Sequence, residues 1–148
     1  MNLAFYIDKL GQDNLNEKIF ECLNSAVKNN TVSDASLFYN DIDYNPYQSN
    51  FGMFNSTDIW NYTGVLVATT IDNAMFANRV INKFKLYFLY RKNQRSNLLY
   101  LLQISKNIAM ICIDEESKQE LKRLTDIDAK LINNFSAEEF LELKYASN

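Results

Sequence analysis

The chain has 148 residues, 47% of them hydrophobic, which is enough for one globular domain with a continuous core. It contains no His, three Gly and two widely separated Cys, which argues against Ser-His-Asp or Cys-His catalysis, a structural zinc site and glycine-rich phosphate loops. Its formal net charge of −3 and the lack of a recognition motif argue against nucleic acid as a ligand.

The sequence also bears on location. No apolar run approaches the roughly 18 residues that a membrane span needs, and Asp8 interrupts the one stretch that resembles a secretory signal. Cys22 and Cys112 fall where core thiols of a reducing compartment are expected. We therefore expect a cytoplasmic protein without membrane contact, metal or cofactor. Its abundant Asn is typical of an AT-rich genome such as that of many phages, in which case the location is the host cytoplasm.

Six short apolar runs predict buried strands, and a helix-like segment follows all of them but the second. The runs are Leu3–Ile7, Ser36–Tyr39, Val65–Ala68, Lys85–Tyr90, Ala109–Ile113 and Ala129–Ile132. This alternation predicts the α/β class. We expect a single Rossmann-like three-layer domain over residues 1–148, with a mostly parallel sheet of about six strands.

The helices have start signals of their own. Asn14 and Glu17 resemble a capping box at the start of the first helix, and Ser136 with Glu139 resembles a second one before a short terminal helix. Ser96 is the expected cap of the helix that follows the fourth strand.

The second strand runs into the longest irregular stretch, which holds the only Pro. Loops of this length are often functional, and this one is rich in aromatic residues. The rings either pin the loop onto the domain or form a binding surface. The candidate partner-contact residues are Tyr44, Tyr47 and Trp60.

In a parallel sheet the residues that follow the strands meet at one edge, where ligands bind. The candidates at this edge are Asp8, Lys9, Thr69, Thr70 and Asp114. A basic turn joins them, because residues 73–113 contain seven basic and no acidic side chains. The candidate anion site is Arg91, Lys92, Arg95 and Ser96, just before a predicted helix start. The alternative is a solvated turn whose cations pair with acidic neighbours.

No carboxylate pair is singled out by its spacing, so we assign no catalytic residue. We expect a non-catalytic binding or accessory protein that uses the strand edge and the basic turn for a protein partner, a second copy of the chain, or an anionic or sugar ligand. Another hypothesis is that the protein is a structural subunit of a larger assembly.

Four stretches carry a family resemblance: Asn2–Gly11, Val65–Asn73, Ile108–Leu121 and Lys130–Asn134. Each is similar to a strand and its following turn or helix in the N-terminal, acceptor-side half of GT-B glycosyltransferases. The resemblance implies a Rossmann-like fold and an acceptor-side surface. The family has a Gly-rich turn after the first strand, where this chain has only Gly11, and Asn134-Phe135 stands where the family has Asn-Gly. The family's donor domain has no counterpart, so transferase activity would require a partner chain.

Overall fold

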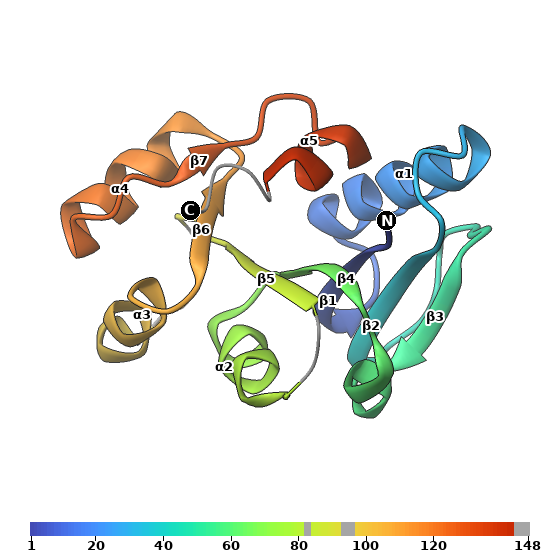
Figure 1. Ribbon diagram of the computed structural model, residues 1–148, viewed down its shortest axis with the longest axis horizontal. Coiled ribbons are helices and arrows are strands. Elements are labelled where there is room, and N and C mark those ends of the chain that lie inside the picture. Colours follow the sequence, from blue (N-terminus) through green and yellow to red (C-terminus); the bar gives the residue numbers. More distant parts are fainter. Residues whose placement is uncertain (82–83, 93–96, 144–148) are drawn as a thin grey trace.

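A computed structural model describes residues 1–81, 84–92 and 97–143 of the chain. Within these ranges seven parallel strands form one sheet in the order β3-β2-β1-β4-β5-β6-β7 (Figure 1). The strands are β1 (Leu3–Leu10), β2 (Ala35–Ile42), β3 (Gly52–Asn55), β4 (Gly64–Ala68), β5 (Phe84–Leu89), β6 (Ala109–Cys112) and β7 (Lys130–Leu131). The predicted fold, a Rossmann-like α/β domain with a parallel sheet, is confirmed.

Helices cover both faces of this sheet. On one face lie α1 (Asn14–Lys28) and α5 (Ala137–Glu142), and on the other lie the 3₁₀ helix η1 (Ser56–Asn61), α2 (Ile71–Arg79), α3 (Leu98–Ser105) and α4 (Glu115–Thr125). The alternation of side chains along β1 explains the two layers. Phe5 and Ile7 pack toward α1 and α5, whereas Ala4 and Tyr6 pack toward the opposite layer.

The segment that follows β2 differs from the prediction of a long loop. It contains β3, which pairs in parallel with β2 from Ser36 opposite Gly52 to Tyr39 opposite Asn55. β3 is a four-residue edge strand that is only partly buried, and it begins with Gly and ends with Asn. Such a strand has no continuous apolar run, so hydrophobic patterning does not detect it.

The sequence predicts three helix-capping residues, and the structure differs from the prediction at two of them. Asp13, not Asn14, caps α1, because its carboxylate accepts a hydrogen bond from the Leu15 amide (2.8 Å). Asn97, not Ser96, caps α3, and Ser96 itself lies outside the described residues. Ser136 caps α5 as predicted, since its hydroxyl accepts from the Glu139 amide (3.4 Å).

The two thiols, Cys22 and Cys112, are buried core residues, as expected. Burial raises the pKa of each to about 12, so both are neutral and unreactive near pH 7. Of the helices that the structure describes, none has the length and apolar character to span a bilayer.

The strand order reverses once, between β1 and β4. From β1 the chain moves outward through β2 and β3, and it then returns to the other side of β1 to build β4 to β7. The helices that leave β1 and β4 therefore cover opposite faces of the sheet. Doubly wound sheets with this order bind ligands in the crevice outside the strand ends at the reversal point.

Candidate functional site

A hydrogen-bonded cluster of side chains occupies the reversal point at the carboxyl ends of β1, β2 and β4. The Asn40 amide nitrogen donates to Asp8 Oδ1 (3.0 Å) and to Asn73 Oδ1 (2.7 Å). The Tyr6 hydroxyl donates to Asn40 Oδ1 (2.6 Å), and burial raises the pKa of this phenol, which keeps it a donor. Asn40 therefore holds the Asp8 carboxylate in a fixed place beside the end of β4.

A hollow of about 380 Å³ opens next to this cluster. We call it the switch-point hollow. The described residues that line it are Asp8, Thr70, Ile71, Asp72, Arg91, Asn97 and Tyr100. They come from β1, from the turns after β4 and β5, and from the first turns of α2 and α3. Its volume falls within the range of about 300–1,000 Å³ that is typical of small-molecule sites.

Arg91 is the only cation among the described residues that line the switch-point hollow. Its Nε atom is buried and makes no hydrogen bond within residues 1–81, 84–92 and 97–143. A buried guanidinium nitrogen without an acceptor costs free energy. The positive charge of the guanidinium can attract an anion to the hollow through charge-assisted hydrogen bonds.

The helix starts at the hollow offer an anion few free donors. Thr70 Oγ1 accepts from the Asn73 amide (3.1 Å) at the start of α2. The Asn97 side chain accepts from the amides of Leu99 (2.9 Å) and Tyr100 (3.4 Å) at the start of α3. These caps use three of the first-turn amides, those of Asn73, Leu99 and Tyr100. Arg91 is the one positively charged group of the described lining.

Lys92, the other described cation of the predicted basic turn, does not line the switch-point hollow. Lys92 Nζ lies 3.8 Å from Glu116 Oε2, and the Lys92 amide donates to Ser117 Oγ (2.9 Å). With Arg91 and Asp114, these residues line a second hollow of about 470 Å³ at the start of α4. Arg95 and Ser96 lie outside the described residues.

Only some of the predicted strand-edge residues line the switch-point hollow. Asp8 and Thr70 line the switch-point hollow, whereas Thr69 is buried beneath it and its hydroxyl donates to the Tyr6 carbonyl (3.3 Å). Lys9 points toward Asp43, with 4.0 Å between Nζ and Oδ1. Asp114 caps α4 by accepting from the Ser117 amide (2.7 Å).

The predicted partner-contact residues have different environments. Tyr47 packs on Phe20 with 4.8 Å between ring centroids, and its hydroxyl contacts the backbone of Asp13, so it pins the loop to α1. Tyr44 and Trp60 are 48% and 50% exposed, which leaves half of each side chain accessible to another molecule.

Several residues of the site were not among the sequence candidates, among them Asn40, Asn73 and Tyr100. Asn40 directly follows the second predicted strand, so the strand-edge argument could have found it. Asn73 and Tyr100 lie inside helices, and only the packing of α2 and α3 brings them to this edge.

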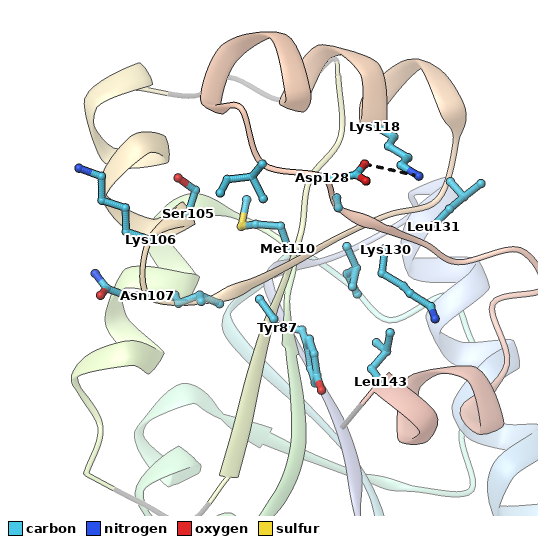
Figure 2. Close-up of a pocket in the computed structure, with 15 residues that line it drawn as sticks. Tyr87, Ser105, Lys106, Asn107, Met110, Lys118, Asp128, Lys130, Leu131 and Leu143 are labelled. Atoms are coloured by element: carbon cyan, nitrogen blue, oxygen red, sulfur yellow. Dashed lines mark ion pairs between the residues drawn. The ribbon is translucent and has the colours of Figure 1, made fainter. Parts of the chain in front are cut away.

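A larger hollow, of about 640 Å³, lies at the opposite edge of the sheet, near the starts of β6 and β7. Figure 2 shows its lining, in which Lys106, Lys118 and Lys130 stand among apolar residues and Lys118 is paired to Asp128 (3.7 Å). It is not at the strand-order reversal. Among the described residues no cluster of three or more Cys, Asp or Glu could hold a metal ion.

Comparisons with family models, with curated proteins and with solved structures find no significant match to this chain.

Proposed function

We propose that this protein is a binding or accessory protein that holds a small ligand in the switch-point hollow, with an anionic group of the ligand on Arg91. The observation that carries the proposal is Arg91, the only cation among the described residues that line the hollow at the strand-order reversal. Its Nε atom has no acceptor among the described residues. The fixed position of Asp8, held by Asn40, supports a pre-formed site. Two buried, unpaired thiols support a cytoplasmic location for the protein.

Replacing Arg91 with Gln should weaken binding of an anionic probe by about 10- to 150-fold, because a hydrogen bond to a charged group contributes about 1.5–3 kcal/mol. Inorganic phosphate, AMP and glucose 6-phosphate are suitable probes, followed by NMR chemical shifts or calorimetry. Arg79→Gln is the matched control, since Arg79 is an exposed residue at the other end of α2. Equal affinities of the Arg91→Gln protein and the natural protein for all three probes would refute the anion site.

A second candidate is a glycosyltransferase-like half enzyme that a partner chain completes. The all-parallel Rossmann-like sheet favours it, because this is the fold that the family resemblance implies. Half-exposed Tyr44 and Trp60 offer contact surface for such a partner. We expect sugar-nucleotide turnover only when the protein is assayed together with the chains that co-purify with it. Absence of turnover in both assays would eliminate this candidate.

A further inference from the structure

The charges that line the switch-point hollow limit the chemistry of its occupant. Two exposed acidic residues, Asp8 and Asp72, line the same hollow as Arg91. None of the ion pairs among the described residues joins these groups to one another or to a fourth residue. Opposite charges that share a hollow without pairing there are complementary to a ligand that carries both signs.

A simple anion satisfies only part of this lining. The three charges of the described lining add to −1, so a dianion such as phosphate gains Arg91 but is repelled by two nearby carboxylates. An ammonium group on the same ligand reverses that repulsion, because it donates charge-assisted hydrogen bonds to carboxylate oxygens. The lining therefore favours a zwitterion over a phosphate ester.

The Asp8 carboxylate can accept a hydrogen bond from such an ammonium group. Its Oδ1 accepts from the Asn40 amide (3.0 Å), and Asn40 is itself held by the Tyr6 hydroxyl (2.6 Å). Asp8 Oδ2 makes no hydrogen bond within the part of the chain that the structure describes, so it can accept one from a ligand. Asp72, in the first turn of α2, supplies the second carboxylate.

We propose that the ligand of the switch-point hollow is an α-amino acid, with its carboxylate on Arg91 and its ammonium group on Asp8 and Asp72. This inference rests on the proposed anion site. The hollow of about 380 Å³ accommodates a molecule of this size, and Tyr100 lines it as an aromatic contact for the amino-acid side chain.

The test begins with the twenty protein L-amino acids, screened one by one against the full chain by ligand-detected NMR. The strongest binder is then compared by calorimetry with its N-acetyl derivative, which lacks the ammonium group, and with its carboxamide, which lacks the carboxylate. We expect each derivative to bind at least tenfold more weakly than the amino acid. No binding by any amino acid, or undiminished binding of the N-acetyl derivative, would overturn the inference.

Asp72→Asn separates this inference from the anion site on which it rests. It should weaken amino-acid binding at least tenfold while strengthening the binding of inorganic phosphate, because it removes a repulsive charge. Asp34→Asn, an exposed Asp just before β2 at the other edge of the sheet, is the control and should change neither. One outcome would refute the amino-acid ligand but leave the anion site in place. In that outcome phosphate binding depends on Arg91, and Asp72→Asn strengthens the binding of amino acids as well as that of phosphate. If no probe depends on Arg91, the anion site itself fails.

Discussion

Replacing Phe5 with Ala should lower the free energy of unfolding by about 3–5 kcal/mol, as large-to-small changes of buried aromatic residues do. Phe5 lies on the central strand β1 and is fully buried. Its ring makes an edge-to-face contact with Phe140 (5.1 Å between centroids) and stacks on Phe135 (5.7 Å). The truncation leaves a cavity between β1 and α5, and it removes the ring that holds this short helix to the sheet. Urea denaturation measures the loss.

Phe54→Ala is the matched control for this change. Phe54 lies on the edge strand β3, is 42% exposed, and touches Phe38 at a centroid distance of 5.9 Å. Its truncation should cost less than about 1.5 kcal/mol, because a large part of the residue is already in contact with water and less apolar surface is lost from the core. A Phe5→Ala loss no larger than that of Phe54→Ala would contradict the placement of β1 at the centre of the core.

Most of the strands that the sequence predicts lie inside the sheet, whereas the edge strand β7 was predicted from the apolar run that surrounds it. Ala109–Cys112 is nearly continuous in apolar residues, and such a run is typical of a central parallel strand. β3 escapes prediction because an edge strand has one exposed side and needs no such run. Pairing order is also absent from hydrophobic periodicity, so the position of the strand-order reversal had to come from the structure.

The same limit explains which site residues could be predicted. Asp8, Thr70 and Arg91 lie at or just after the ends of predicted strands, so their common edge was predictable from the chain order alone. Arg91 and Lys92 are neighbours in sequence, but only Arg91 lines the switch-point hollow, whereas Lys92 contacts Glu116 on α4. The direction of each side chain depends on how α3 and α4 pack, and a linear pattern of charges does not contain that information.

Gly64→Ala should also be strongly destabilising, by about 2–4 kcal/mol, for a reason of backbone geometry. Gly64 starts β4 with φ near +129°, a backbone conformation that residues with a Cβ rarely adopt. A Cβ built there would lie 2.5 Å from the Asn2 carbonyl oxygen, which accepts the hydrogen bond of the Val65 amide (2.9 Å). The backbone of β1 or β4 must therefore move, and this hydrogen bond between the two strands is lost.

Gly11→Ala is the internal comparison for this variant, because a Cβ at Gly11 meets only the Asp43 side chain, at an ordinary contact distance of 3.6 Å. It should change stability by less than about 1 kcal/mol, as surface substitutions without strain do. Thermal and urea unfolding of the two variants measure the difference. Similar stabilities would mean that β4 does not enter the sheet through this close approach to Asn2. The pairing of β1 with β4, on which the switch-point hollow depends, would then have to be redrawn.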